Sequence, residues 1–147
     1  MTEVLVTGTF NVMHAGHVEL FEYASQYGSV TVGINADSYL HDKYGEDKTV
    51  PMLNRAYVVS SCCFVDEVVI FTKSDPSALI RQLKPQFFVR GPDYSGVALV
   101  EQDALDEVGA KVIIQCADKI HNASSLIENV AESAFTSVSA MMSWKQY

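Results

Sequence analysis

Residues 4–34 read VLVTGTFNVMHAGHVELFEYASQYGSVTVGI. This stretch begins with a short apolar run at 4–6 and ends with a second at 30–34, and such continuous runs are typical of strands buried on both faces. Between them, apolar residues recur at helical spacing over 17–27 until Gly28 ends the pattern. The stretch therefore predicts a strand, a helix and a second strand.

The remainder of the chain continues this alternation. Further apolar runs lie at 68–71, 87–89 and 112–114. Helical patterns cover 53–62 and 98–108, the latter ending at Gly109. A further helix begins behind Ser74-Asp75-Pro76 and closes at Lys84-Pro85, and a last one starts at Asn122 or Ser124. The order predicts an α/β fold, namely a Rossmann-like, doubly wound open sheet of about five parallel strands with helices on both faces. The polar interval 42–48 is expected to be a mobile loop.

Length and composition limit the organisation and the partners. The 147 residues, 48% of them apolar, suffice for one core, so we expect one domain over 1–135 and a C-terminal tail at 136–147 that packs on it or on a dimer partner. The net charge of −8 argues against a nucleic-acid partner, and no apolar stretch approaches the roughly 20 residues that a membrane helix needs. Cys62, Cys63 and Cys116 have no C-x-x-C spacing, which predicts buried thiols in a reducing compartment. We expect a cytoplasmic protein.

The segment between the first strand and the first helix carries the chemistry. Gly8 and Gly16 allow a phosphate to approach the backbone, and a helix that begins near Gly16 directs N–H groups and a positive dipole end toward an anion. The segment is neither a P-loop nor G-x-G-x-x-G. His14 and His17 are three residues apart and can face one bound group. Three roles are open for them. They could donate to phosphate oxygens, or ligate a metal whose other ligands the sequence does not clearly supply. Alternatively, one histidine caps the helix and the other packs against the protein.

Gly8-Thr9-Phe10 followed by His14-Ala15-Gly16-His17 resembles the G-T-F-D-x-x-H-x-G-H signature of cytidylyltransferase-like nucleotidyltransferases, especially glycerol-3-phosphate cytidylyltransferases and sugar-phosphate nucleotidylyltransferase domains. Two departures stand out. Asn11 replaces the signature aspartate, and only Ser124-Ser125 matches the terminal R-T-E-G-I-S-T-T pattern. The arginine of that pattern is also absent from the related heptose-phosphate adenylyltransferase domains. The resemblance continues in order through Asn35-Ala36-Asp37, Lys43, Asn54-Arg55, 65–69, 88–94 and 122–125.

The resemblance implies an enzyme that joins a nucleoside triphosphate to a phosphorylated small molecule and releases pyrophosphate. A CTP-dependent cytidylyltransferase with an acceptor such as glycerol 3-phosphate is the favoured interpretation. The alternatives are an ATP-dependent adenylyltransferase that acts on a sugar 1-phosphate, and a nucleotide-binding module with weakened catalysis. Mg²⁺ is expected to arrive with the triphosphate, and the protein is expected to be a homodimer.

The resemblance also assigns roles to individual residues. His14 and His17 hold the phosphate chain, and Lys43, with Lys48 as its rival, moves from its loop toward the α-phosphate. No residue is assigned to a metal held by the protein alone. The nucleotide-binding residues are Gly8, Thr9, Phe10, Gly16, Gly91, Asp93, Tyr94, Ser124 and Ser125, and the acceptor-binding residues are Asn11, Asp37 and Arg55.

Overall fold

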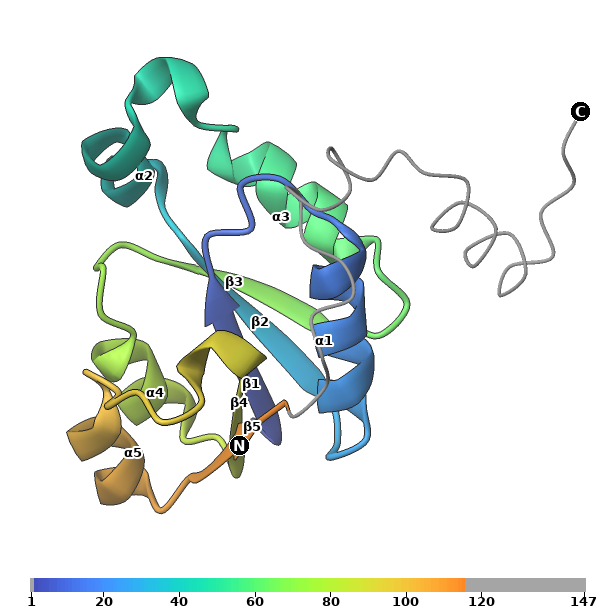
Figure 1. Ribbon diagram of the computed structural model, residues 1–147, viewed down its shortest axis with the longest axis vertical. Helices are drawn as coiled ribbons and strands as arrows, with labels where there is room; N and C mark the ends of the chain where they lie inside the picture. The colour runs from blue at the N-terminus through green and yellow to red at the C-terminus, as the bar shows by residue number, and fades with distance from the viewer. Residues whose placement is uncertain (1, 116–147) are drawn as a thin grey trace, which may run out of the picture.

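A five-stranded parallel sheet forms the centre of the molecule (Figure 1). The computed structural model describes residues 2–115 of the chain. All five predicted strands are confirmed, in the spatial order β3-β2-β1-β4-β5. Their bounds are β1 (Val4–Gly8), β2 (Val30–Asn35), β3 (Glu67–Phe71), β4 (Phe87–Arg90) and β5 (Lys111–Ile114).

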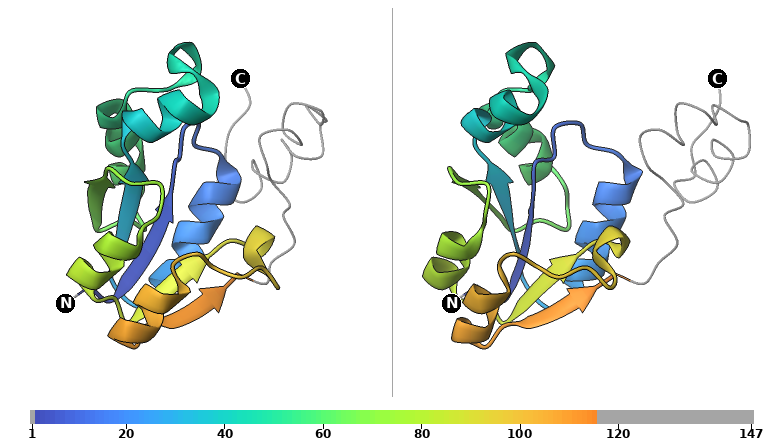
Figure 2. Two further views of the ribbon diagram at one scale, coloured as in Figure 1. Left: turned by 90° about the vertical axis from the view of Figure 1, so that its left-hand side faces the viewer. Right: turned by 60° about the vertical axis from the view of Figure 1, so that its left-hand side comes forward.

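Helices cover both faces of this sheet, as the rotated views in Figure 2 show. One face packs its apolar side chains, Val4 and Val6 among them, against α1 and α3. The other face, which includes Leu5, packs against α4 and α5. Successive side chains of a strand point to opposite faces, so the continuous apolar run of β1 serves both cores. The helices are α1 (Ala15–Ser25), α2 (Asp37–Tyr44), α3 (Met52–Ser60), α4 (Ser77–Leu83) and α5 (Gln102–Val108), with short 3₁₀ turns η1 (Glu46–Lys48) and η2 (Pro92–Tyr94).

The sheet opens between β1 and β4. β1 pairs with β2 along its whole length, but it pairs with β4 only at Val4 and Leu5. The chain order reverses at this point, since β2 lies on one side of β1 and β4 on the other. Open α/β sheets bind their ligands in the crevice outside the carboxyl ends of such strands. The fold therefore directs attention to the ends of β1 and β4.

The expected mobile loop at 42–48 is wrong. Helix α2 ends at Tyr44 and η1 follows at Glu46–Lys48, so the interval is largely helical, and α2 projects beyond the carboxyl edge of the sheet at the upper left of Figure 1. This helix buries only Leu40, and a helix with one buried side chain shows no apolar periodicity. Asp37 in its first turn complements the helix dipole, a local signal that we had assigned to the acceptor site instead.

Other expectations need smaller corrections. α5 begins at Gln102 rather than at 98, and α4 begins at Ser77 behind the carboxylate of Asp75, with Pro76 at the N-cap position instead of the first helical position. Cys63 is exposed and Cys62 is half-buried, so a buried thiol is wrong for Cys63. The last helix, Cys116, Ser124, Ser125 and the tail at 136–147 lie outside the described residues. None of the helices within 2–115 is long and apolar enough to cross a membrane.

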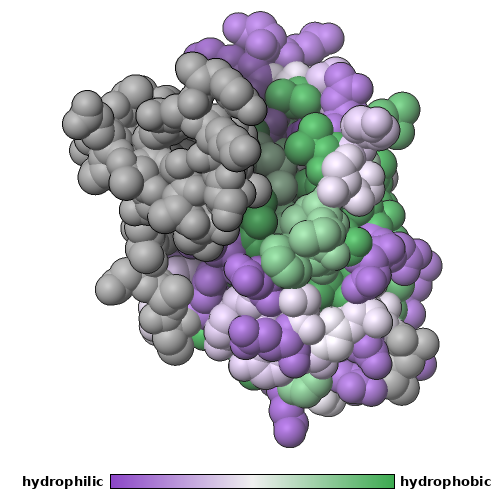
Figure 3. All heavy atoms as spheres, turned by 90° about the vertical axis from the view of Figure 1, so that its right-hand side faces the viewer, coloured by the Kyte–Doolittle hydropathy of each residue, from purple (hydrophilic) through white to green (hydrophobic). Residues whose placement is uncertain are grey.

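An apolar surface is exposed on the side that carries α1 and α3. Figure 3 shows apolar side chains there between hydrophilic areas. The exposed residues include Val12 before α1, and Leu53 and Val58 on α3. Contiguous apolar surface commonly marks a contact with another protein. The homodimer expected from the sequence stays a prediction, and this apolar surface is a candidate for its interface.

The turn between α1 and β2 is fastened to the start of β1 by Glu3. Its Oε2 accepts the Ser29 N–H at 2.5 Å, and the Val4 N–H donates to the Ser29 carbonyl at 3.1 Å. Gly28 has a φ of +144°, and a Cβ there would lie 2.7 Å from Glu3 Oε2. The hydrogen bond from the Ser29 backbone lowers the pKa of Glu3 below its ordinary value.

This hydrogen bond gives the stability a defined dependence on pH. Because the pKa of Glu3 is lower in the folded state, its carboxylate stabilises the fold above the ordinary carboxyl pKa of about 4 to 4.5, and this contribution disappears as the pH falls through the lowered value. We expect Glu3→Gln to lose less stability than the wild type as the pH falls from about 5 to about 3, the range around the carboxyl pKa. The reason is that glutamine keeps an acceptor but does not titrate. Urea unfolding at pH 7, 5, 4 and 3 measures this. Parallel pH curves for the two proteins would contradict the assignment.

Candidate active site

A strained turn at Phe10 shapes the loop that follows β1. Phe10 has a φ of +45°, a conformation that is uncommon for a residue with a large side chain. Its buried ring packs against Phe21 of α1 with ring centroids 5.2 Å apart. A Cβ at Gly8 would lie 3.0 Å from two atoms of this ring, so the glycine makes room for it. Backbone strain of this kind concentrates at ligand sites.

The two histidines cap α1 reciprocally. Nδ1 of His14 accepts the Gly16 N–H at 3.1 Å, and Nδ1 of His17 accepts the His14 N–H at 3.3 Å. Their rings stack with centroids 3.9 Å apart, and the His17 ring also meets Phe10 edge-on at 5.0 Å. Because both Nδ1 atoms accept, the ring hydrogen of each histidine is on Nε2, which can donate to an anion. The Gly16 N–H, which we expected to face a phosphate, is used by His14 instead.

A cavity of about 180 Å³ lies at the switch point, between the ends of β1 and β4. Both histidines line it, as does the loop after β4. No cluster of three or more His, Cys, Asp and Glu side chains within 2–115 could hold a metal ion, so the described residues supply no further ligands for a metal at His14 and His17. The lining residues are Thr7, Gly8, Thr9, Phe10, His14, Gly16, His17, Glu19, Leu20, Val89, Arg90, Gly91, Pro92, Asp93, Tyr94 and Gln115.

Arg90 occupies the opening between β1 and β4. Its Nη1 donates to the Thr7 carbonyl at 3.2 Å, where β1 no longer pairs with β4, and its Nη2 forms a short contact with Glu101. The guanidinium lies between the rings of Phe88 and Tyr94, 4.8 and 4.5 Å from their centroids. Arg90 is 9% exposed and Glu101 1%, so this is a buried ion pair. It joins the two ends of the loop 91–100.

A second cavity of about 210 Å³ adjoins the first. Lys43 of α2 lines it, with its Nζ 5.7 Å from the centroid of the Tyr39 ring and 5.1 Å from that of Tyr44. Hydrogen bonding to Tyr44 raises the pKa of Lys43 above its ordinary value, so the ammonium stays charged. The second cavity is lined by Thr7, Gly8, Thr9, Asn35, Tyr39, Lys43, Phe71, Ser74, Pro76, Arg90 and Tyr94. It thus shares the end of β1, Arg90 and Tyr94 with the first.

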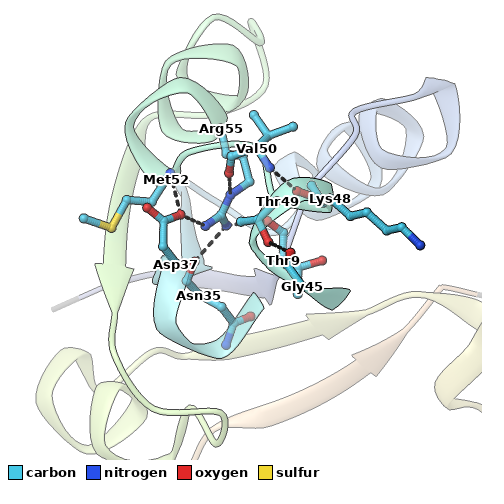
Figure 4. A network of polar contacts seen from close by, with 10 residues as sticks. Thr9, Asn35, Asp37, Gly45, Lys48, Thr49, Val50, Met52 and Arg55 are labelled. Carbon is cyan, nitrogen blue, oxygen red and sulfur yellow. Dashed lines mark hydrogen bonds and ion pairs between the residues drawn. The ribbon is translucent and has the colours of Figure 1, made fainter. Parts of the chain in front are cut away.

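Arg55 is the hub of a polar network beside these cavities (Figure 4). The residue is 1% exposed, and every nitrogen of its guanidinium donates to the protein. Its Nη1 reaches the carbonyls of Thr9 at 2.8 Å and Asn35 at 2.7 Å, and its Nε reaches that of Val50 at 2.7 Å. Its Nη2 pairs with Asp37 Oδ1 at 3.0 Å. Three separate segments of the chain therefore converge on one side chain.

The structure brings most of the expected site residues together. Gly8, Thr9, Phe10, His14, Gly16, His17, Gly91, Asp93 and Tyr94 line the first cavity, and Lys43 lines the second. The three expected acceptor residues line neither. Asp37 and Arg55 pair with each other, and Asn11 bonds to the backbone of Lys48 and Val50, so the geometry favours positioning roles for all three.

Sequence reasoning missed other residues of the lining, including Thr7, Asn35 and Arg90. Each is at or near the carboxyl end of a predicted strand, which is where ligands of such sheets bind, so position alone could have identified them. Among the described residues, Thr7 Oγ1 and Arg90 Nε are buried side-chain atoms without a hydrogen-bond partner, and both belong to residues that line the two cavities. Unsatisfied buried groups of this kind are rare elsewhere in proteins.

An open parallel sheet with two histidines at the first helix, beside a cavity at its switch point, defines a Rossmann-like nucleotide-binding protein. The family model described as cytidylyltransferase-like matches residues 5–139. The chain belongs to this family and is a nucleotidyltransferase of the cytidylyltransferase-like type.

Several curated relatives are bifunctional proteins named HldE. The chain is 41% identical over 107 residues to HldE of Aliarcobacter butzleri, and the aligned region covers 71% of this chain and 22% of that protein. HldE of Nitratiruptor sp. is 38% identical over 107 residues, covering 71% and 23%. HldE of Streptomyces coelicolor is 31% identical over 135 residues, covering 90% and 29%. The chain thus spans 22–29% of the length of these relatives.

Solved structures share the fold. A lipopolysaccharide core biosynthesis protein from Thermoplasma volcanium has a TM-score of 0.62 at 22% identity, with 78% of this chain and 93% of that chain covered. A protein of unknown function from Archaeoglobus fulgidus has a TM-score of 0.65 at 21% identity, with 82% and 94% covered. These similarities support the Rossmann-like architecture alone.

The Arg55 network predicts a large effect on stability. Arg55→Met removes the ion-pair partner of Asp37, which then keeps the Met52 N–H as a donor, and leaves three backbone carbonyls without the guanidinium. Breaking an ion pair whose arginine is fully buried costs up to about 3–5 kcal/mol. The matched control is Arg81→Met, since Arg81 pairs with Glu107 at 2.7 Å on the exposed surface. We expect urea denaturation to give a much lower midpoint for Arg55→Met and almost no shift for Arg81→Met. Equal shifts for the two variants would contradict the hub.

Proposed function

We propose that this nucleotidyltransferase transfers a nucleoside monophosphate from ATP to a sugar 1-phosphate and releases pyrophosphate. The observation that supports it most is the pair of adjoining cavities at the carboxyl edge of the sheet. One holds the two histidines and the other holds Lys43. A transfer between two bound phosphates needs two such sites with a common border, and the residues at the border are Thr7, Gly8, Thr9, Arg90 and Tyr94.

The chemistry of each cavity suits one substrate. The first offers Nε2 hydrogens from His14 and His17 and a glycine-rich backbone, which suit a triphosphate chain. The second offers the ammonium of Lys43 together with the side chains of Asn35 and Tyr39, which suit a phosphate attached to a polyhydroxylated ring. We therefore place the nucleotide in the first cavity and the phosphorylated acceptor in the second.

Catalysis in this arrangement depends on positioning and charge. An oxygen of the acceptor phosphate attacks the α-phosphorus and forms a new P–O bond. The bond from the α-phosphorus to the oxygen that bridges to the β-phosphate breaks in line, and pyrophosphate leaves with that electron pair. No protein nucleophile takes part. The imidazole hydrogens of His14 and His17 stabilise the negative charge that grows on the phosphate oxygens, and Lys43 offsets the repulsion between the two substrates.

Two observations favour ATP over the CTP that the sequence first suggested. The chain lacks the terminal arginine of the cytidylyltransferase signature, as do the heptose-phosphate adenylyltransferase domains that it resembles. Relatives that are 31–41% identical to the chain, including the three described above, are HldE proteins. Together they support a phosphorylated sugar in preference to glycerol 3-phosphate.

Mg²⁺ is proposed to enter with the triphosphate. Mg²⁺ keeps several of its waters and prefers phosphate oxygens to a cage made of protein groups alone, so a dedicated cluster of protein ligands is not required. The ion would neutralise charge on the triphosphate.

A panel assay tests the function directly. We expect pyrophosphate release with ATP, Mg²⁺ and one of several sugar 1-phosphates, including hexose and heptose 1-phosphates, and none after chelation of the metal. CTP with glycerol 3-phosphate, phosphocholine and phosphoethanolamine forms the second arm. Turnover only in that arm would return the protein to the cytidylyltransferases. Binding of nucleotide without turnover in either arm would make it a binding module.

The histidine pair gives a separate prediction. We expect His17→Ala to lower kcat by about 100-fold or more, because its Nε2 hydrogen stabilises charge that develops in the transition state. Tyr57→Ala, an exposed position on α3 outside both cavities, serves as a control for handling and folding. Thermal melts report whether each variant is folded. A folded His17→Ala protein with normal kcat would remove this residue from the catalytic set.

A further inference from the structure

A buried hydroxyl without a partner lies at the border of the two cavities. Thr7 is 6% exposed, and its Oγ1 is one of two buried side-chain atoms within residues 2–115 that lack a hydrogen-bond partner. Buried polar groups are nearly always paired, because a hydroxyl taken out of water loses its hydrogen bonds to the solvent. Thr7 lines both cavities. Its hydroxyl is therefore available to a bound substrate.

The side chain of Thr7 faces the second cavity. Successive side chains of β1 alternate between the two faces of the sheet, so Thr7 shares its face with Leu5, which packs against α4. The segment before α4 supplies Ser74 and Pro76 to the lining of the second cavity. The Thr7 methyl group is turned toward β2, since a Cβ at Gly33 would lie 3.1 Å from Thr7 Cγ2. The hydroxyl is thus left at the cavity that we assign to the acceptor.

The surroundings of Thr7 favour a neutral ligand group over a phosphate. Arg90 lies beside it and donates to the Thr7 carbonyl at 3.2 Å, but the charge of Arg90 is balanced by the buried carboxylate of Glu101. The Tyr94 ring covers the same guanidinium, with its centroid 4.5 Å away. The lysine of this cavity is Lys43, which suits the acceptor phosphate. A neutral group of the same substrate is therefore left to meet Thr7.

A sugar hydroxyl has the bonding capacity that Thr7 requires. A threonine hydroxyl has one O–H donor and two acceptor lone pairs, so it can donate to or accept from another hydroxyl. The transfer takes place where the two cavities meet, and Thr7 is at that border. The substrate hydroxyl that reaches it is therefore on the carbon next to the one that carries the phosphate. In a sugar 1-phosphate this group is the 2-hydroxyl.

We propose that Thr7 is a specificity-determining residue whose hydroxyl binds the 2-hydroxyl of the sugar 1-phosphate. The inference deepens the proposed function and rests on it for the class of acceptor. It narrows that class to sugars that carry a hydroxyl at C2, at the expense of their 2-deoxy counterparts. The unpaired hydroxyl of Thr7 gains its partner when such a substrate binds.

Three ligands test the assignment, each as its α- and β-anomer. They are glucose 1-phosphate, mannose 1-phosphate and 2-deoxyglucose 1-phosphate, which is the 2-deoxy form of both. We expect the wild type to bind one of the two hydroxylated sugars about tenfold more tightly than the deoxy compound, the scale of one hydrogen bond. Calorimetric titration gives the Kd values. Equal values for the wild type, or no binding of any of the three sugars, would overturn the inference.

Variants of Thr7 show whether its hydroxyl causes the preference. Thr7→Val keeps the shape of the side chain without the hydroxyl, so the preferred sugar and its deoxy form should bind within about twofold of each other. Thr7→Ser keeps the hydroxyl and retains the preference. So does the control Thr31→Val, since Thr31 of β2 is equally buried and lines neither cavity. A preference that survives in Thr7→Val, or that is lost in either of the other two variants, would contradict the assignment.

Thermal melts separate this inference from the proposed function. A buried hydroxyl without a partner destabilises the free protein, so ligand-free Thr7→Val should melt at the same temperature as the wild type or higher. A lower melting temperature would mean that the hydroxyl has a partner within the protein, and the inference would fail. If the wild type discriminates between the sugars but releases no pyrophosphate, only the proposed function fails. If it releases pyrophosphate and Thr7→Val keeps the preference, only the role of Thr7 fails.

Discussion

The buried guanidinium of Arg55 is the interaction on which the carboxyl edge of the sheet depends. It is the shared donor for the carbonyls of Thr9 in the loop after β1, Asn35 at the end of β2 and Val50 between η1 and α3. Carbonyl oxygens that converge in this way repel one another and would each require a donor once buried. A planar side chain with five N–H groups satisfies all three at once, and Asp37 balances its charge. The site is therefore organised by a residue that lines neither cavity.

The second constraint is the divergence of β1 from β4. Where two parallel strands diverge, their facing backbone groups are left unpaired. At the end of β1, Arg90 donates to the Thr7 carbonyl. Because Arg90 also pairs with the buried Glu101, the loop 91–100 is held at both ends over the opening. The same opening that weakens the sheet creates the space for a ligand.

The sequence predicted the architecture well and the bonding partners of polar residues less well. Every strand followed from its apolar run, whereas α2 was missed because it buries only Leu40. The histidine loop was recognised from spacing. Arg55 and Asn11 were assigned to the acceptor because a side chain's type indicates which bonds it can form, whereas its partners are set by loops distant in sequence. No local pattern encodes the contact between Asn11 and Lys48.

In the proposed reaction, the two histidines would combine helix capping with stabilisation of phosphate charge. The first N–H groups of a helix lack partners within the helix and commonly bind an anion directly. Here the Gly16 and His14 N–H groups donate to imidazole nitrogens, and each ring then presents a hydrogen on its opposite nitrogen. The Nε2–H groups of the two rings thus take the place of backbone N–H groups as donors, one ring width farther from the helix end. The two rings stack with their centroids 3.9 Å apart. Orientation of these donors is thus established by the fold before a substrate binds, which is the condition for stabilising charge that appears only in the transition state.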